Sequence, residues 1–232
     1  MVIPAHNEAE NVGPLLREIA VALRAAGVPA YEVVIVDDGS TDGTSERANA
    51  AAREVPELVV VRHASPRGQS FATVSGVRAA RGRWIATLDG DGQNDPADIA
   101  KLIAARGIAS GAAGPLLLAG HRKARRDSWL KRVSSRVANG VRGRLLGDRT
   151  PDTGCGLKLF EREAFLRLPH FDHMHRFLPA LFLRAGGRVV SVEVGHRPRT
   201  RGRSHYGMWN RLWVGIVDLF GVWWLIRRRE RS

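Results

Sequence analysis

Cysteine, long apolar runs and glycine-rich nucleotide turns are scarce in this chain of 232 residues, and each scarcity excludes a class of protein. The single cysteine, Cys155, excludes a disulfide framework within the chain and is expected to be a small buried residue. Residues 212–226 are mostly apolar, but as a helix they would span only roughly 22 Å of the ~30 Å core of a bilayer. No Gly-x-Gly-x-x-Gly turn follows the first expected strand, which disfavours a dinucleotide-binding dehydrogenase.

The net charge of +13 comes from two segments of the chain. Residues 1–120 carry 11 basic and 14 acidic side chains, residues 121–149 carry 10 and 2, and residues 197–232 carry 9 and 2. Basic segments of this kind attract the phosphates of nucleic acids, lipid head groups or small substrates. An arginine-rich proteome would produce the same excess, so charge alone does not assign a partner.

Strand and helix patterns alternate along the first 120 residues. Short apolar runs typical of buried strands occupy residues 2–4, 31–36, 58–62, 84–88 and 116–119, and helical spacing occupies residues 8–26, 45–52, 67–80 and 96–105. The alternation predicts an α/β fold with a mostly parallel central sheet and helices on both faces. In the second half, helices are expected over 127–146, 163–168 and 177–185, and strands over 157–160 and 188–194.

Three of the expected strands end in polar residues. The first leads into Ala5-His6-Asn7-Glu8, the second into Asp37-Asp38-Gly39-Ser40, and the fourth into Asp89-Gly90-Asp91-Gly92-Gln93. Ligands of open α/β sheets gather at the carboxyl ends of the strands. Carboxylates one residue apart, such as Asp89 and Asp91, can hold a divalent ion against a diphosphate. These strand ends therefore predict one nucleotide site.

Five motifs resemble glycosyltransferase family 2, in the branch of dolichyl- and polyprenyl-phosphate mannose or glucose synthases. In chain order they cover residues 3–8, 36–44, 89–96, 152–158 and 199–206. The resemblance implies the GT-A fold for residues 1–206, followed by a C-terminal tail, residues 207–232, that forms an amphipathic or apolar helix. The Gln-x-x-Arg-Trp motif of processive polysaccharide synthases is missing, which disfavours a polymerase.

The resemblance assigns catalysis and metal binding to Asp89, Asp91 and Gln93, with Mg²⁺ or Mn²⁺ as the cofactor. The ion would bridge the diphosphate of the donor and stabilise the leaving nucleoside diphosphate. Asp152 is a further catalytic candidate, as the general base for a hydroxyl acceptor, although capping the following turn is an equal alternative. A phosphate acceptor is already ionised near neutral pH and needs no base.

The resemblance also implies two groups of residues that bind a nucleotide-sugar donor. One group follows the early strands, and the other lies on a loop expected to close over the diphosphate: Pro4, His6, Glu8, Asp37, Asp38, and Arg199, Ser204, His205. For Asp37, capping of the local turn is an open alternative. Two residues depart from the branch, which usually has an aromatic residue in place of His6 and a lysine in place of His205. The imidazole of His6 can stack on a base, but that of His205 is a weaker and pH-dependent phosphate partner than lysine.

The basic segment around residue 130 is expected to bind the phosphate of a polyprenyl-phosphate acceptor. By resemblance, the candidates are Arg122, Lys131, Arg132 and Ser135. A solvated basic helix is the alternative interpretation. The histidines at 170, 173 and 175 lack the spacing of a zinc site and are expected to lie on a loop.

The tail combines four tryptophans with a run of arginines, residues 227–229. This composition suits a helix lying on an anionic membrane surface. The alternative is a helix packed on the protein itself or on a second copy, which would make a homo-oligomer.

The sequence as a whole predicts an inverting glycosyltransferase at the cytoplasmic face of the cell membrane. It would move a hexose from GDP-mannose or UDP-glucose to a polyprenyl phosphate. One alternative is a family 2 enzyme with a sugar or lipid hydroxyl as acceptor. The other is a non-catalytic protein that binds membranes or nucleic acid; the Asp89 and Asp91 pair disfavours it, so no nucleic-acid partner is expected.

Overall fold

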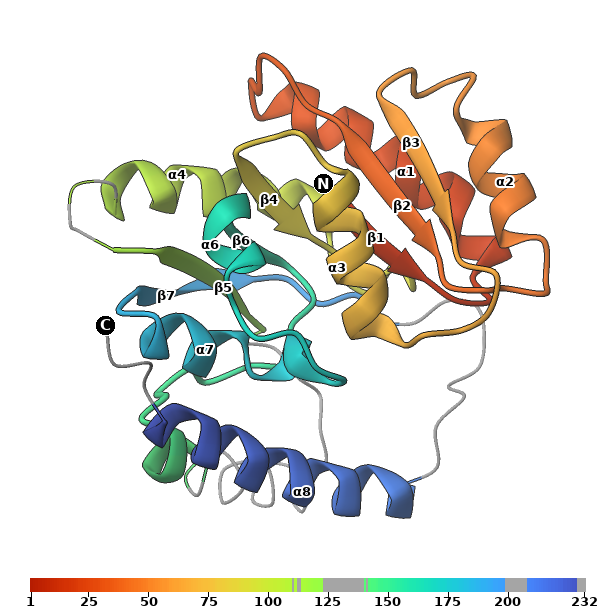
Figure 1. Ribbon diagram of the computed structural model, residues 1–232. Coiled ribbons are helices and arrows are strands. Elements are labelled where there is room, and N and C mark those ends of the chain that lie inside the picture. Colours follow the sequence, from red (N-terminus) through yellow and green to blue (C-terminus); the bar gives the residue numbers. More distant parts are fainter. Residues whose placement is uncertain (110, 112–113, 123–139, 141, 199–207, 229–232) are drawn as a thin grey trace.

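One seven-stranded sheet organises the chain, in the strand order β3-β2-β1-β4-β6-β5-β7 (Figure 1). The structure is a computed structural model that describes residues 1–109, 111, 114–122, 140, 142–198 and 208–228. The strands are β1 (Val2–Ala5), β2 (Val33–Asp37), β3 (Leu58–Arg62), β4 (Trp84–Thr87), β5 (Leu116–Arg122), β6 (Lys158–Glu161) and β7 (Arg188–Val194). All neighbouring strands are parallel except β6, which is antiparallel to both β4 and β5.

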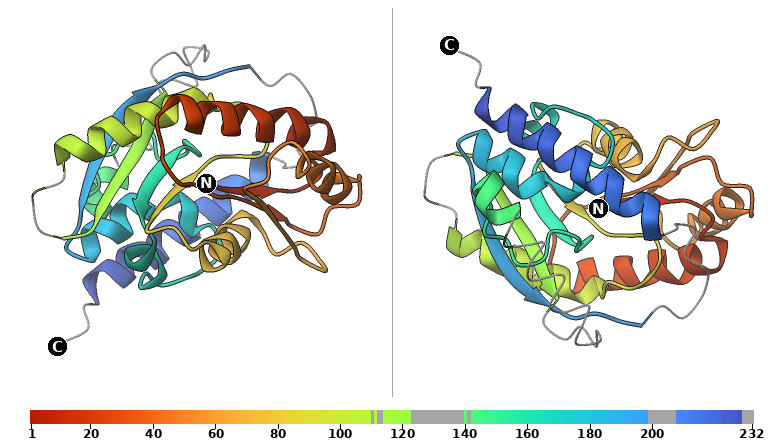
Figure 2. Two further views of the ribbon diagram at one scale, coloured as in Figure 1. Left: turned by 90° about the horizontal axis from the view of Figure 1, so that it is seen from above. Right: turned by 90° about the horizontal axis from the view of Figure 1, so that it is seen from below.

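Helices cover both faces of this sheet (Figures 1 and 2). One face carries α1 (Ala9–Ala25), α2 (Thr44–Ala51) and α4 (Ile99–Ala109), which pack together and against the strands. The other face carries α3 (Gln69–Ala79), α6 (Arg162–Leu166) and α7 (Leu178–Arg184). The predicted α/β architecture, with helices on both faces of a mostly parallel sheet, is confirmed.

The pleat of the strands divides the apolar residues between two cores. Along β2, Val33 and Ile35 face the layer of α1, whereas Val34 and Val36 face the layer of α3. Successive side chains of a strand point to opposite faces, so a strand buried on both faces is a continuous apolar run. This explains why the early strands are uninterrupted in the sequence.

Several ends of helices and strands differ from the predicted ones. Strand β5 continues to Arg122 instead of ending at residue 119, because residues 120–122 pair with Val192–Val194 of β7. The helix predicted from Pro96 starts as a 3₁₀ turn, Pro96–Asp98, which Asp95 caps by accepting a hydrogen bond from the Ala97 amide (3.0 Å). Most of the helix predicted over 127–146 lies outside the described residues, while residues 142–146 are helical.

The C-terminal helix α8 (Met208–Arg227) packs beside α7, at one edge of the molecule (Figure 1). Val222 is buried in the core on the α3 side of the sheet, and Leu219, Trp223 and Ile226 lie against it. Arg184 of α7 donates hydrogen bonds to the carbonyl of Leu225 (3.1 Å) and to that of residue 228 (2.8 Å), which ties down the end of the helix. Among the described residues, no helix has both the length and the apolar character needed to cross a membrane.

Candidate active site

The three polar strand ends predicted from the sequence meet at one edge of the sheet. Strands β1, β2 and β4 are neighbours and run parallel, so their carboxyl ends lie together. Three backbone amides of the loop after β1 donate hydrogen bonds to side chains of the loop after β2: Asn7 to Ser40 Oγ (2.9 Å), Glu8 to Thr44 Oγ1 (2.9 Å) and Ala9 to Asp42 Oδ2 (3.0 Å). These bonds satisfy amides at the start of α1 that no residue within the helix could satisfy.

Asp37 is occupied by its own turn. Its side chain is fully buried, and it accepts hydrogen bonds from the Ser40 amide (2.9 Å) and from Ser45 Oγ. Of the two roles left open for this residue, turn capping is the one that its contacts match.

Asp38 fastens the segment that leads into α3. Its carboxylate accepts hydrogen bonds from the amides of Arg67 (2.9 Å) and Gly68 (2.7 Å), and Nδ1 of His63 lies 2.7 Å from the same carboxylate. The side chain is almost completely buried. These three partners hold the backbone at Arg67 and Gly68 in place, a contact that the sequence did not reveal, and the predicted role of Asp38 in nucleoside binding remains a prediction.

His6 and Glu8 are held by local contacts in the loop after β1. The ring of His6 has Nδ1 2.7 Å from the Asp38 carbonyl and Nε2 3.2 Å from the amide nitrogen of Asn7. In the tautomer that matches both contacts, Nδ1 donates to the Asp38 carbonyl and Nε2 accepts from the Asn7 side chain. Asn11 donates to the Glu8 carboxylate (2.6 Å).

Asp89 lies directly after β4 and is positioned by two distant segments. Gln69, the first residue of α3, donates a hydrogen bond to Asp89 Oδ1 (2.7 Å). Gly156 faces the same carboxylate so closely that a Cβ atom there would lie 2.3 Å from Asp89 Oδ2. Neither contact is visible in the sequence, because the partners are separated by 20 and 67 positions.

The ionised form of Asp89 is disfavoured by its surroundings. Burial, together with the neighbouring charge of Asp91, raises the pKa of Asp89 to about 6, while the charges of Lys158 and Arg122 oppose the shift. Asp91 accepts a hydrogen bond from the Gln93 amide (3.1 Å), which closes the turn between them. Two adjacent carboxylates that repel one another fit a divalent cation between or beside them.

No cluster of three or more histidine, cysteine or acidic side chains with metal-binding geometry occurs among the described residues. A hard divalent ion does not require such a cluster, because Mg²⁺ and Mn²⁺ sites commonly take only one or two carboxylates and complete their shell with phosphate oxygens and water. Asp89, Asp91 and the amide oxygen of Gln93 therefore fit the predicted ion.

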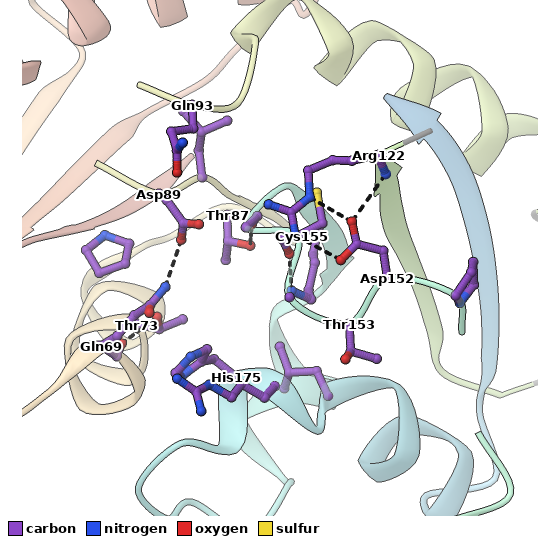
Figure 3. Close-up of a pocket in the computed structure, with 18 residues that line it drawn as sticks. Gln69, Thr73, Thr87, Asp89, Gln93, Arg122, Asp152, Thr153, Cys155 and His175 are labelled. Atoms are coloured by element: carbon purple, nitrogen blue, oxygen red, sulfur yellow. Dashed lines mark hydrogen bonds and ion pairs between the residues drawn. The ribbon is translucent and has the colours of Figure 1, made fainter. Parts of the chain in front are cut away.

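A cavity of about 470 Å³ opens beside Asp89 (Figure 3). Figure 3 shows Asp89 and Gln93 on one side of it, the Arg122 and Asp152 pair on another, and His175 at the end near α7. Of the predicted residues, it is lined by Pro4, Asp89, Gln93, Arg122 and Asp152. Gly156 and Lys158, which also line it, belong to the 152–158 motif but were given no role of their own. Gln69 and Arg176 were not singled out in the sequence, and His175 was assigned only to a loop.

Arg122 and Asp152 form a nearly buried, two-point ion pair. The guanidinium donates from Nε to Oδ2 (2.7 Å) and from an Nη atom to Oδ1 (2.9 Å). Hydrogen bonding and charge from Asp152 raise the pKa of Arg122 against the opposing effect of burial. A carboxylate held in this way is a poor general base, because the paired guanidinium stabilises its ionised form.

Arg197 is a residue that the sequence reasoning missed. It follows β7, and its guanidinium forms ion pairs with Glu18 (2.6 Å) and Asp95 (2.9 Å). Its amide donates to the Gln93 carbonyl (2.9 Å). The chain just before residue 199 is therefore anchored to the turn that carries the predicted metal ligands.

Several predicted residues lie outside the described part of the chain. These are Lys131, Arg132 and Ser135 of the acceptor set and Arg199, Ser204 and His205 of the donor set. Their roles remain predictions.

Comparison with known proteins identifies the family of the chain. The chain is 36% identical to the dodecaprenyl-phosphate galacturonate synthase of Rhizobium johnstonii, over 100% of this chain and 68% of that protein. It is 32% identical to the undecaprenyl-phosphate 4-deoxy-4-formamido-L-arabinose transferase of Edwardsiella ictaluri, over 90% of this chain and 62% of that protein. The chain thus spans about two thirds of the length of these relatives.

Solved structures share the fold at lower identity. The mannosyl-3-phosphoglycerate synthase of Rubrobacter xylanophilus superposes with a TM-score of 0.73 at 16% identity, covering 100% of this chain and 75% of that one. The glucosyl-3-phosphoglycerate synthase of Mycobacterium tuberculosis, in complex with Mn²⁺, uridine diphosphate and glucosyl-3-phosphoglycerate, does so with a TM-score of 0.69 at 20% identity, covering 100% and 80%. These likenesses confirm the predicted GT-A fold. Residues 1–168 match the profile described as glycosyl transferase family 2, and the chain belongs to that family.

Proposed function

We propose that this protein transfers a sugar from a nucleotide-sugar donor to a polyprenyl phosphate. The observation that carries the proposal is the cavity in which Asp89 and Gln93 meet the Arg122 and Asp152 pair, at the carboxyl edge of a GT-A sheet. The relatives named as dodecaprenyl- and undecaprenyl-phosphate transferases support the acceptor class. The donors predicted from the sequence, GDP-mannose and UDP-glucose, remain predictions.

Asp89, Asp91 and Gln93 would hold Mg²⁺ or Mn²⁺ against the diphosphate of the donor. When bound, the ion supplies charge stabilisation to the departing nucleoside diphosphate. The chain's own contribution is to place the ligands: Gln69 fixes one oxygen of Asp89, and Gly156 leaves room for the carboxylate. The Mn²⁺ complex of a structural neighbour supports this choice of ion.

The nucleoside would lie over the loops after β1 and β2. His6 offers a ring face, and Pro4 lines the cavity on that side. Asp38 would act indirectly, by fixing the Arg67–Gly68 backbone from which Gln69 reaches Asp89. The segment after Arg197, with Arg199, Ser204 and His205, would supply positive charge to the diphosphate.

The acceptor phosphate would attack the sugar from the side opposite the diphosphate, and Arg122, Lys131, Arg132 and Ser135 are proposed to bind it. A phosphate monoester is ionised near neutral pH, so the attack needs no proton acceptor. The salt bridge that occupies Asp152 supports this acceptor over a hydroxyl group, which would require a free base.

The protein is proposed to work at an anionic membrane surface on the cytoplasmic side. Helix α8 exposes four large apolar side chains, those of Ile216, Val217, Phe220 and Trp224. The guanidinium groups of Arg227 and Arg228 lie over the rings of Trp223 and Trp224. An apolar face beside arginines suits a lipid interface. Burial of the apolar side chains would contribute ~25 cal/mol per Å² to the free energy of membrane binding, and each arginine roughly 1 kcal/mol.

A donor screen tests this function. The protein is incubated with radiolabelled UDP- and GDP-sugars, a divalent ion, and vesicles containing decaprenyl phosphate, and labelled lipid is extracted. Transfer to decaprenyl phosphate but not to decaprenol supports the proposal. Transfer only to decaprenol or to free sugars would instead establish the hydroxyl-acceptor alternative.

A further inference from the structure

Helix α8 contains a single acidic residue, Asp218, which the proposed membrane contact does not use. The exposed face of the helix carries the apolar side chains of Ile216, Val217, Phe220 and Trp224. Val222 is buried in the core on the other side, and Asp218 precedes it by one helical turn, so the two residues share the packed face. The Asp218 side chain is only 18% exposed. A carboxylate withdrawn from water in this way is costly unless a partner compensates it.

His173 is that partner, and it belongs to a different segment of the chain. Nδ1 of its ring lies 3.0 Å from the Asp218 carboxylate, and the two form an ion pair when the ring is protonated. The backbone of His173 has a φ of 60°, in the left-handed region that residues other than glycine rarely adopt. Strained backbone of this kind persists where surrounding contacts hold it. The contact with α8 and the 3.7 Å approach of Nε2 to the Asp172 carboxylate are two such contacts.

His173 stands at the start of a turn that lines the candidate active site. It immediately precedes the 3₁₀ turn Met174–Arg176, and its carbonyl accepts a hydrogen bond from the Arg176 amide (3.1 Å). His175 and Arg176 line the cavity beside Asp89, and Figure 3 shows His175 at the end near α7. One ion pair therefore connects the C-terminal helix to the segment that forms this end of the cavity.

The same turn is also fixed to α3. The His175 amide donates a hydrogen bond to Ser70 Oγ (3.3 Å), and Nδ1 of the ring lies 2.8 Å from that oxygen. Ser70 follows Gln69, whose side chain donates to Asp89. The turn thus joins α8, which carries the proposed membrane surface, to the helix that holds a proposed metal ligand.

We propose that Asp218 is a positioning residue of the active site, which acts through His173 to hold the turn Met174–Arg176 in its place in the cavity. Binding of α8 to a membrane then fixes the turn together with the helix. The end of the cavity that carries Arg176 is thereby set relative to the lipid surface from which the acceptor comes. This inference rests on the proposed function, because it takes the acceptor to be a lipid phosphate.

Other contacts hold α8 on the protein, so the ion pair is not needed for that purpose. Val222 is buried in the core, and Arg184 of α7 donates hydrogen bonds to two carbonyls at the end of the helix. A partly exposed ion pair adds little to stability, and an apolar side chain at position 218 would pack without the cost of burying a charge. What the carboxylate supplies is a directed contact with the residue at which the cavity turn begins.

Hydrogen exchange of the full chain, with and without vesicles of phosphatidylglycerol and phosphatidylcholine, tests the coupling. The amides of Met174, Arg176 and Phe177 donate hydrogen bonds within the turn and report its opening. Vesicle binding should slow their exchange by roughly threefold or more in the wild type and leave it unchanged in Asp218→Asn. The control is Glu163→Gln on α6, where the glutamate side chain is 72% exposed; it makes the same change in charge and should behave as the wild type. Equal slowing in the wild type and Asp218→Asn, or no slowing in the vesicle-bound wild type, would overturn the inference.

Kinetics separate positioning from a general loss of structure. Asp218→Asn should raise the KM for decaprenyl phosphate in vesicles roughly fivefold, while kcat and the affinity for UDP with Mn²⁺ change less than about threefold. His173→Gly should have the same effect, since glycine adopts the backbone conformation of this residue without strain. The double variant should be no worse than either single variant, because both remove the same contact. Asp218→Glu keeps a carboxylate and should restore most of the wild-type KM.

Two kinetic results would refute the positioning role. Additive losses in the double variant would show that Asp218 and His173 act independently. A parallel loss of kcat, of UDP affinity and of acceptor affinity would give the pair a structural role only.

Failure of the proposed function gives a different result. If no sugar is transferred to decaprenyl phosphate, that function is refuted, while hydrogen exchange still decides whether α8 and the turn are coupled. If the wild type and Asp218→Asn transfer sugar with the same KM, the function holds and the positioning role does not. If the wild type does not sediment with the vesicles, both the membrane contact and the inference are refuted.

Discussion

His175 makes the stability of this protein dependent on pH in a calculable way. Burial, followed by the charges of Lys158 and Arg176, lowers the pKa of this histidine from 6.5 to about 3. The unfolded chain therefore binds a proton at this site below about pH 6.5, and the folded protein does not until about pH 3. Stability from this group is complete above pH 6.5 and is lost as the pH falls toward 3.

The expected size of the effect follows from the two pKa values. Linkage between a pKa of 6.5 in the unfolded chain and about 3 in the native state gives a loss of about 2.5 kcal/mol between pH 7 and pH 4.5. His175→Gln keeps a side chain that can bond Ser70 but cannot titrate. The variant should lack this part of the pH dependence, although other groups will still contribute to its profile.

Urea unfolding of the full chain at half-unit steps from pH 7 to pH 4.5 measures the difference. The free energy of unfolding of the wild type should fall more steeply than that of His175→Gln, by close to 1.4 kcal/mol per pH unit near pH 5. The control is His170→Gln, five residues earlier, because His170 does not line the cavity. This variant measures how the loss of an imidazole elsewhere changes the dependence of the unfolding free energy on pH. Parallel profiles for wild type and His175→Gln would show that the histidine is protonated in the folded state, and would refute the reasoning.

Three further outcomes are expected. Binding of a nucleoside diphosphate should require a divalent ion and fail in Asp89→Asn and Asp91→Asn, because these carboxylates are the proposed ligands of the ion. If calorimetry gave the same affinity for the nucleoside diphosphate with and without EDTA, this prediction would be wrong. Gly156→Ala should weaken Mn²⁺–UDP binding at least tenfold, since its Cβ would displace the Asp89 carboxylate. The control is Gly154→Ala, which should bind normally because its Cβ would meet its nearest atom at 3.5 Å. Equal affinities of the two variants would contradict this prediction. The double variant Phe220→Ser, Trp224→Ser should sediment with anionic vesicles at least tenfold less than the wild type, because both side chains are more than half exposed and available to lipid. Its affinity for UDP should not change. Unchanged sedimentation would refute the proposal that α8 binds the membrane.

The sequence predicted the sheet and the position of the site because both depend on local patterns. Continuous apolar runs such as residues 33–36 mark strands buried on both faces, and the polar residues that follow them mark the carboxyl edge. Asp89, Asp91 and Gln93 were identified for this reason. The antiparallel placement of β6 between β4 and β5 was not predictable, because a short strand carries no signal of its partners.

The parts of the site that escaped prediction depend on contacts between distant segments. Gln69 reaches Asp89 from the start of α3. Lys158 was part of a motif identified from the sequence, but its place in the cavity depends on a strand that is inserted out of sequence order. Asp38 is a mixed case, since its motif predicted a ligand contact, and the partners that the structure gives it are two backbone amides and the ring of His63. A carboxylate at a strand end is chemically suited to both roles, and only its neighbours decide between them.

These contacts also connect the two halves of the proposed donor site. Asp38, at the end of β2, holds the backbone at Arg67 and Gly68, and the next residue, Gln69, holds Asp89 at the end of β4. A change at Asp38 is therefore expected to affect Asp89, a proposed metal ligand, through two hydrogen-bonded steps within one short segment. The loops after β2 and β4, which carry the two acidic motifs, are thus coupled through the segment that begins α3.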